Sequence, residues 1–374
     1  MRHLLSPAKP DLPPGCSAPA ARPKGRGALG NPPVRFETLH REAEAADWPE
    51  EEVPRLATSL IRDRTRSVIS WNESPDLGFD RAVNPYRGCE HGCIYCYARP
   101  THAWLGYSPG LEFETRLVFK PEVASLLEKE LAKPGYRAAP LVLGSNTDPY
   151  QPIERQLKLT RAVLEVLERC GHPVGIVTKS ASILADLDIL ARLAARRLVR
   201  VDISLTTLDG DLARRMEPRA AAPARRLEAM RALARAGVPV GVLAAPMIPG
   251  LNDAELERIL AAAAGAGAGW ASYILLRLPH EVAELFRAWL EAEFPARAAH
   301  VLSLIRQTRA GALNESGFGA RFRGTGPVAD LLAQRFARAA RAQGLAEGRV
   351  ALDPGQFRPP VLTRAAAEGQ LALL

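Results

Sequence analysis

Short apolar runs alternate along this chain with longer segments of helical periodicity, starting at about residue 80. The apolar runs lie at 140–144, 173–178, 199–205, 238–245 and 271–277. Apolar spacings of three and four predict helices at 121–133, 153–170, 183–198 and 224–236. Two more helices are expected, one after Asn252, which can act as an N-cap with Glu255 three residues on, and one opened by Pro279. With a strand just before residue 88, this makes about six β/α units.

This alternation predicts an α/β fold in which helices cover a parallel sheet. Six units of this kind suit either a partial barrel or a doubly wound sheet. Both architectures collect functional groups at the carboxyl ends of the strands. We therefore expect a core over residues 80–300, preceded by an N-terminal extension at 36–79. Residues 301–374 are expected to form a C-terminal extension with one clear helix at 328–343.

The first 35 residues differ from the rest of the chain. They contain eight prolines and few large apolar side chains, which predicts a disordered basic arm. The chain begins without the apolar stretch of a secretory signal. The longest uncharged run, 259–276, is mostly alanine and glycine, so it predicts helix, turn and strand rather than a membrane span. We expect a cytoplasmic protein with no membrane partner.

Composition adds charge to this picture. The chain has 374 residues, of which 47% are hydrophobic and 24% charged, and this excludes a wholly disordered or fibrous protein. The formal net charge is +8, and 42 of the 49 basic residues are arginine. A basic chain suits a nucleic-acid or other anionic partner. A codon bias toward arginine would give the same composition without such a partner.

The strongest candidate for chemistry is a short loop with three cysteines. Cys89, Cys93 and Cys96 follow the spacing C-x3-C-x2-C, which lets three thiolates converge, and the glycines at 88 and 92 free the backbone to wrap around a bound group. Thiolates favour zinc, copper(I) or iron–sulfur clusters, and structural zinc needs a fourth ligand. The candidates for that ligand are His91, His102 and Cys170. Three cysteines without an obvious fourth favour a four-iron cluster with one open iron.

This loop, with Tyr95 just before the last cysteine, resembles the cluster-binding loop of the radical S-adenosylmethionine (SAM) superfamily. The resemblance implies a partial (β/α)6 TIM-like barrel, flanked here by the N-terminal arm and a C-terminal helical extension. It implies a [4Fe–4S] cluster on Cys89, Cys93 and Cys96, with SAM bound to the open iron. Reductive cleavage of SAM would give a 5′-deoxyadenosyl radical that abstracts hydrogen from a substrate. The electron would come from an external donor of flavodoxin or ferredoxin type.

Further motifs resemble the spore photoproduct lyase-like branch of that superfamily and, more narrowly, an uncharacterised bacterial family within it. The segments that carry this resemblance are NPYRGCEHGCIYCYA at 84–98, TDPYQPIE at 147–154, VTKS at 177–180, Ser204 with Glu217 and Pro218, and APMIPGLN at 245–252. Two shorter stretches, GRGA at 25–28 and NPPVRF at 31–36, also fit. The resemblance therefore covers roughly residues 25–310.

The resemblance implies SAM-binding roles for side chains near the strand ends. These side chains are Tyr95, Tyr97, Ser145, Thr147, Asp148, Lys179 and Ser204. Thr147 or Asp148 could accept from the SAM ammonium, Lys179 could pair with its carboxylate, and Ser204 could bind ribose or carboxylate. Each also has an ordinary alternative, such as a polar turn, an exposed lysine or a satisfied strand hydroxyl. Glu217 and Arg219 would either reach SAM or form surface ion pairs.

One position departs from the photoproduct lyase pattern. Those lyases carry a cysteine at the end of the second strand, where it returns a hydrogen atom to the product radical. The matching residue here is Ser145. An alcohol O–H bond is much stronger than a thiol S–H bond, so serine is a poor substitute. Cys170 does not align with that position and is expected to be a buried structural thiol.

The sequence therefore predicts a radical SAM enzyme whose substrate is open. Nucleic acid is the leading candidate, because of the branch that the motifs resemble and the basic charge. A peptide or small molecule is the alternative within the enzyme class. In a different class, a zinc-stabilised nucleic-acid-binding module would also explain a cysteine loop in a basic chain.

Overall fold

The computed structural model describes residues 23–36, 56–346 and 348–362. Its centre is a seven-stranded sheet of order β10-β9-β8-β7-β6-β3-β2, in which only β2 (Ile69–Trp71) is antiparallel to its neighbour. The six parallel strands are β3 (Arg81–Val83), β6 (Leu141–Leu143), β7 (Val174–Thr178), β8 (Val199–Ser204), β9 (Val240–Met247) and β10 (Ala271–Leu275). Their order follows the chain without the reversal of a doubly wound sheet, which confirms the six-unit partial barrel.

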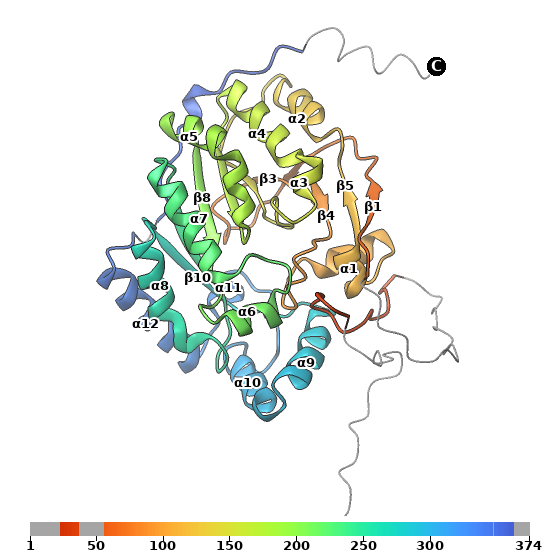
Figure 1. The fold of residues 1–374 in the computed structure, drawn as a ribbon, viewed down its shortest axis with the longest axis vertical. Coiled ribbons are helices and arrows are strands. Elements are labelled where there is room, and N and C mark those ends of the chain that lie inside the picture. The colour runs from red at the N-terminus through yellow and green to blue at the C-terminus, as the bar shows by residue number, and fades with distance from the viewer. Residues whose placement is uncertain (1–22, 37–55, 347, 363–374) are drawn as a thin grey trace, which may run out of the picture.

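The connecting helices lie outside the sheet (Figure 1). They are α2 (Val123–Leu131), α4 (Leu159–Cys170), α5 (Leu187–Ala195), α7 (Pro223–Arg235), α8 (Leu256–Gly265) and α9 (Val282–Glu293). Their apolar faces and the sheet enclose the main core, which includes the fully buried Leu127, Leu164 and Leu233. Removing these apolar side chains from water is the main force that stabilises the barrel.

Two predicted helices are divided. The segment 153–170 forms α3 (Glu154–Leu157) and then α4, because Lys158 between them has a φ of 50° in the left-handed region. The segment 183–198 begins within a 3-10 helix (Ala181–Asp186) and continues as α5. Gly171 ends α4 in the left-handed conformation, as the sequence predicts. Apolar spacing predicted the helical segments, but the local backbone decided where they break.

The predicted cap at Asn252 is wrong. Its amide donates to the carbonyls of Thr206 and Pro246 at 2.8 and 2.9 Å, and no side-chain cap forms on the short 3-10 helix (Asp253–Glu255) that follows. Glu255 does not complete a capping box either, because its carboxylate accepts from the Thr207 hydroxyl at 2.6 Å. Both side chains join the loop after β9 to the loop after β8, which stabilises the carboxyl edge of the barrel.

A second sheet of order β1-β5-β4 lies beside the first β/α unit. β1 (Ser59–Arg62) is parallel to β5 (Arg116–Phe119), and β4 (Tyr86–Arg87) is antiparallel to β5. The cysteine loop starts directly after β4, and α1 (Leu111–Thr115) leads directly into β5. This sheet, which the sequence did not predict, therefore positions the start of the loop.

The predicted disordered arm is wrong for residues 23–35, while residues 1–22 lie outside the described part. Arg26 is only 3% exposed and donates to the Glu114 carbonyl at 2.8 Å. The backbone N–H groups of Gly27 and Ala28 donate to the Glu114 carboxylate at 3.0 and 2.9 Å. A Cβ at Gly27 would lie 1.8 Å from the Gly92 carbonyl oxygen, so only glycine permits this approach to the cysteine loop.

The C-terminal extension is helical, as expected. It contains α11 (Ala320–Arg323) and α12 (Pro327–Ala342), and it follows α10 (Pro295–Gln307). On α11, Arg321 forms an ion pair at 2.7 Å with Asp76 of the loop between β2 and β3. This pair bridges the open side of the partial barrel between β10 and β2. In the described part of the chain, no helix is both long and apolar enough to cross a membrane.

Candidate active site

A cavity of about 640 Å³ lies at the carboxyl ends of the barrel strands. Its lining includes all the site residues that the sequence selected, namely Cys89, Cys93, Tyr95, Cys96, Tyr97, Ser145, Thr147, Asp148, Lys179 and Ser204. The cysteines and tyrosines come from the loop after β4, whereas the others end or follow β6, β7 and β8. The parallel sheet brings these distant segments together at one edge.

The cysteine loop is held in place through hydrogen bonds to its backbone, and not through contacts of the cysteine thiols. Gly92 has a φ of 66°, and a Cβ there would lie 2.7 Å from a carboxylate oxygen of Glu114. Arg99 is fully buried and donates to the carbonyls of Cys93 and Gly92 at 2.9 and 3.2 Å. It also pairs with Glu114 at 2.5 Å. The buried Arg99–Glu114 pair therefore anchors both the loop and residues 26–28, a role that sequence reasoning missed.

The three cysteines of the loop are free thiols. Cys89 and Cys93 are buried, and Cys96 is partly exposed. Burial raises the pKa of Cys89, and the neighbouring Asp148 and cysteines raise it further. Burial likewise raises the pKa of Cys93. Buried thiols of this kind stay neutral unless a bound metal stabilises the thiolates.

The donor set fits a cluster better than a single zinc ion. Ligands of one tetrahedral zinc lie about 3.8 Å apart, given Zn–S bonds of about 2.3 Å. Among the described residues, no three His, Cys, Asp or Glu side chains are arranged to hold one metal ion. Thiolates at three corners of a cubic cluster stand further apart, and all three cysteines line the same cavity. The residues present therefore fit a [4Fe–4S] group with one iron open.

The candidate fourth ligands have other roles. His91 Nδ1 lies 3.4 Å from a carboxylate oxygen of Asp148. His102 is fully buried and packs edge-on against Phe113, outside the cavity lining, and burial lowers its pKa to about 4. Cys170 is buried at the end of α4, as expected, and does not line the cavity either.

Asp148 connects the cysteine loop to β7. One carboxylate oxygen accepts from the Thr178 hydroxyl at 2.7 Å and the Tyr150 N–H at 2.9 Å. The other accepts from the Lys179 N–H at 2.7 Å and lies close to His91. Burial would raise the pKa of Asp148, but the adjacent His91 and these hydrogen bonds outweigh burial and lower it to about 2. Three protein donors and the nearby His91 therefore occupy the two oxygens of Asp148, which is held between the cysteine loop and β7.

Lys179 and Ser204 form a pair on the cavity wall. Lys179 Nζ donates to Ser204 Oγ at 3.0 Å, and Ser204 Oγ donates in turn to the Ala245 carbonyl at 3.1 Å. Lys179 Nζ also lies 5.9 Å from the centre of the Tyr95 ring. Among the described residues, no carboxylate forms an ion pair with this lysine. The ammonium is therefore oriented by a hydroxyl and left available to an anion in the cavity.

A buried polar network lies behind Tyr95. The Tyr95 hydroxyl donates to Glu217, which pairs with the buried Arg226 and accepts from the Thr206 hydroxyl at 2.6 Å. Burial would raise the pKa of Glu217, but Arg226 and Lys179 outweigh it and lower the pKa to about 2. Glu217 is thus neither a surface ion pair nor part of the cavity lining, contrary to both sequence interpretations.

The end of β6 is joined to the cysteine loop through Ser145. Its backbone carbonyl accepts from the Tyr97 hydroxyl, and its Oγ accepts from the Asn84 amide at 3.2 Å. The Asn84 side-chain oxygen accepts from the N–H of Asn146 at 3.1 Å. Thr147 donates its hydroxyl to a β4 carbonyl at 2.9 Å. Asn84, which sequence reasoning did not single out, therefore shapes the loop after β6.

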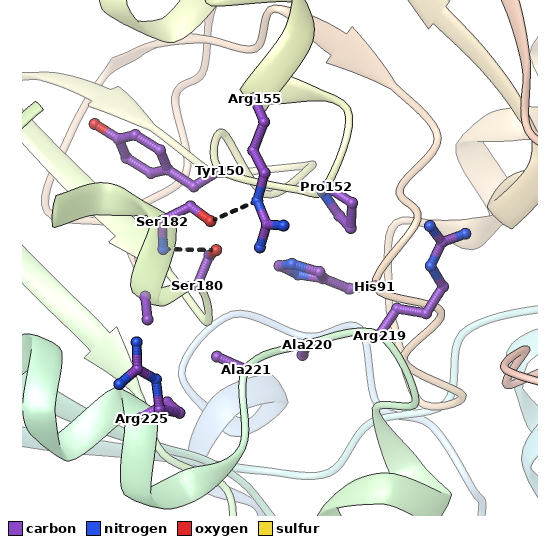
Figure 2. A pocket seen from close by; sticks show the side chains of 11 residues that line it. His91, Tyr150, Pro152, Arg155, Ser180, Ser182, Arg219, Ala220, Ala221 and Arg225 are labelled. Carbon is purple, nitrogen blue, oxygen red and sulfur yellow. Dashed lines mark hydrogen bonds between the residues drawn. The ribbon is translucent and has the colours of Figure 1, made fainter. Parts of the chain in front are cut away.

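A second cavity of about 420 Å³ lies on another side of His91, which lines both cavities. Figure 2 shows the Arg155 side chain extending into it toward His91, with Ser180 and Ser182 on one side. Arg219 and Arg225 also line it, although Arg219 pairs with Glu90 at 3.1 Å. The lining contains no Asp or Glu. This basic pocket thus reaches the loop segment between Cys89 and Cys93.

Comparison with known proteins agrees with this geometry. Residues 83–263 match the family model described as the radical SAM superfamily. An uncharacterised protein of Mycobacterium tuberculosis is 36% identical over 233 residues, which covers 62% of this chain and 68% of that protein. An uncharacterised protein of Methanocaldococcus jannaschii is 27% identical over 196 residues, which covers 52% of this chain and 70% of that one.

Solved structures of spore photoproduct lyase variants share the fold. One has a TM-score of 0.55 and 19% identity, and the match covers 83% of this chain and 88% of that chain. Another, solved with bound AdoMet and dinucleoside spore photoproduct, has a TM-score of 0.53 and 18% identity over 76% and 80% of the two chains.

The fold and site define a partial-barrel protein with a three-cysteine loop at the carboxyl edge of its strands. The chain belongs to the radical SAM superfamily, and it is an enzyme of that superfamily.

Proposed function

We propose that the chain binds a [4Fe–4S] cluster through Cys89, Cys93 and Cys96 and uses it to cleave SAM reductively. The observation that carries the proposal is one cavity whose described lining holds three thiols and no fourth cysteine, together with the Lys179–Ser204 pair. When bound, the cluster supplies the electron that splits SAM, and the resulting 5′-deoxyadenosyl radical removes a hydrogen atom from the substrate.

The chain's own residues bind and orient SAM in this proposal. Lys179 pairs with the SAM carboxylate, and Ser204 orients the ammonium of Lys179. Tyr95 and Tyr97 flank the last cysteine and line the cavity beside the cofactor. Ser145 and Thr147 present polar groups at the end of β6, and Asp148 keeps that end in register with β7.

We assign nucleic acid as the substrate class. Among the described residues, the cavity lining supports this, because it contains Lys179 and three arginines but one carboxylate, Asp148. Arg321 and Arg349 pair with Asp76 and Asp202 outside the lining, which leaves Arg277 and Lys179 without an ion pair. Phosphate contacts would make binding strongly salt-dependent. A peptide or small-molecule substrate is the alternative. Incubation with SAM, reductant and deuterated candidate substrates, following deuterium into 5′-deoxyadenosine, distinguishes them, and no transfer from any nucleic acid would contradict the assignment.

The reaction needs an external one-electron donor, for which we propose a flavodoxin or ferredoxin type protein in the cytoplasm. The second cavity supports such a partner. Its arginines lie next to the loop segment between two cluster cysteines, and an acidic donor surface would complement them (Figure 2).

A zinc-stabilised nucleic-acid-binding module is the competing class. It would need four ligands around one ion, and the described residues offer no such group. Colour separates the two classes, because a zinc protein is colourless and an iron–sulfur protein is brown.

A further inference from the structure

Arg277 follows β10, the last strand of the barrel, and lines the main cavity. Its guanidinium lies 5.0 Å from the centre of the Tyr97 ring and 5.5 Å from that of Phe322. Tyr97 belongs to the cysteine loop and Phe322 to α11, so three distant segments meet at this point. Tyr97 is 45% exposed, which leaves much of its ring open. The sequence had given Arg277 no role.

Arg277 differs from the other cationic side chains of the cavity, because each of those binds an acidic or hydroxyl side chain. Arg321 pairs with Asp76 at 2.7 Å, Arg349 with Asp202 at 2.9 Å, and Lys179 donates to Ser204. Within the described residues, Arg277 forms no ion pair and its guanidinium donates no hydrogen bond to protein. A half-buried guanidinium with no acceptor is unfavourable by itself.

The surroundings of Arg277 make an anion favourable there. Burial lowers its pKa, and the neighbouring Arg321 lowers it further, while Tyr97 has the opposite effect. The one carboxylate of the lining, Asp148, is occupied by protein donors. Guanidinium groups that stack on rings keep their N–H edges free for bidentate binding of phosphate or carboxylate.

The number of available cations exceeds what SAM requires. SAM carries one carboxylate, and the proposed function pairs it with Lys179. Arg277 then remains available to a second anion in the cavity. The rings of Tyr97 and Phe322, which lie beside Arg277, also line the cavity. Exposed rings beside a cation suit a planar base next to its phosphate.

We propose that Arg277 binds a phosphate of a nucleotide substrate, with the exposed ring of Tyr97 against the base of that nucleotide. This inference rests on the proposed function, because it assumes that SAM occupies the Lys179 side of the cavity. A nucleotide within a nucleic-acid strand and a free nucleotide would both supply the phosphate and the base. Arg277 is thus a substrate-binding residue, distinct from the residues assigned to SAM.

The test uses the reconstituted full chain with SAM bound and no reductant. A fluorescein-labelled single-stranded oligonucleotide is titrated and followed by anisotropy at several salt concentrations. Arg277→Gln should weaken binding about tenfold and reduce the slope of log K against log salt by about 1. Arg277→Lys should recover part of the affinity, because it keeps the charge but not the planar fork.

Arg323→Gln is the matched control, since Arg323 is exposed at the end of α11 and, unlike Arg321 and Phe322, does not line the cavity. It should leave oligonucleotide affinity within about twofold. Competition separates the sources of the phosphate: displacement by a mononucleotide supports a free nucleotide, and displacement by unlabelled strands alone supports nucleic acid.

Several outcomes would overturn the proposal. These are equal losses for Arg277→Gln and Arg323→Gln, absence of oligonucleotide and nucleotide binding by the parent protein, or equal competition by an acidic peptide. Iron content and SAM affinity are measured in parallel. If the parent protein lacks either of them, the proposed function fails; if both are normal and Arg277→Gln binds like the parent, only the present inference fails.

Discussion

Lys179 Nζ donates a hydrogen bond to Ser204 Oγ at 3.0 Å, across the carboxyl ends of the neighbouring strands β7 and β8. The serine hydroxyl in turn donates a hydrogen bond to the Ala245 carbonyl of β9 at 3.1 Å. Three adjacent strands therefore orient one ammonium group toward the cavity that holds the cysteines. This relationship gives the SAM-binding proposal its most direct test.

Replacing Lys179 by alanine should weaken SAM binding by about 1.5–3 kcal/mol, the size of a charge-assisted hydrogen bond. Ser204→Ala should have a smaller effect, because it removes only the group that orients the ammonium. Equilibrium dialysis with labelled SAM measures both. Lys129→Ala, on the exposed side of α2, is the control. Unchanged SAM affinity in both site variants would move the binding site to other strand ends.

Single changes of Cys89, Cys93 or Cys96 to alanine should abolish SAM cleavage, because each removes one thiolate of the cluster. The parent protein, reconstituted without oxygen, should contain about four irons and four sulfides per chain. Cys170→Ala should keep both iron and cleavage, because this buried thiol lies outside the cavity. Metal analysis and visible absorbance provide the readout. One tightly bound zinc and no visible absorbance would refute the cluster.

Acid should remove the stabilisation that Glu217 provides. Its pKa of about 2 lies below the ordinary 4.5, so ionised Glu217 stabilises the fold above pH 4.5, and this contribution is lost as the pH falls toward 2. The linkage is on the order of 3 kcal/mol. In iron-free protein, Glu217→Gln should be destabilised by about 3–5 kcal/mol at pH 7, because Arg226 loses its buried partner.

Urea unfolding at pH 7, 5 and 3.5 measures this effect, and the parent and Glu217→Gln curves should converge as the pH falls. Glu228→Gln is the control, because Glu228 pairs with Arg225 on the surface and such pairs contribute little. A constant difference between the parent and Glu217→Gln across this range would show that folding does not shift the pKa of Glu217, and would contradict the prediction.

The chain should not repair spore photoproduct efficiently. Ser145 Oγ lines the cavity and accepts from Asn84, at the position where the lyases it resembles carry a hydrogen-donating cysteine. Breaking a serine O–H bond is strongly uphill for a carbon radical. With dinucleotide photoproduct, SAM and dithionite, we expect slow formation of 5′-deoxyadenosine and little thymine.

Ser145→Cys is the companion variant, because it restores the thiol without changing the charge of the site. Repair that appears only in Ser145→Cys would identify the missing thiol as the barrier. Failure of both proteins to repair, with SAM cleavage intact, would indicate a different substrate. Rapid, clean conversion to two thymines by the parent protein would contradict the prediction.

Reversing the charge of Arg155 should slow flavodoxin-driven SAM cleavage about fivefold and reduce the salt dependence of its rate. The reason is that electrostatic steering of an acidic donor to the second cavity is weakened (Figure 2). Turnover with dithionite should not change in Arg155→Glu. Arg231→Glu, on the exposed side of α7 and outside that cavity, controls for net charge. Equal slowing of both variants would leave the second cavity without this role.

Sequence reasoning succeeded where the signal is local. The cysteine spacing lies within eight residues, and each strand carries its own apolar run followed by its polar end. It failed where a side chain binds a partner far along the chain, as Asn252 and Glu255 do when they reach the loop after β8 instead of capping their own helix. It also failed for residues 23–35, whose glycines and prolines suggested disorder. In the structure this segment is ordered, because the carboxylate of Glu114 accepts hydrogen bonds from two of its N–H groups.

By itself, then, the sequence determined the order of strands and helices, the three-thiol loop and the candidate residues at the strand ends, because periodicity and spacing act over a few residues. Only the tertiary structure decided that Arg99 and Glu114 anchor the loop, that Asp148 is occupied by protein donors, and that Arg277 has no ion-pair partner among the described residues. Whether a buried charge has a partner depends on which segments the sheet brings together. The spatial distance between side chains that are far apart in the sequence cannot be predicted from a local sequence pattern.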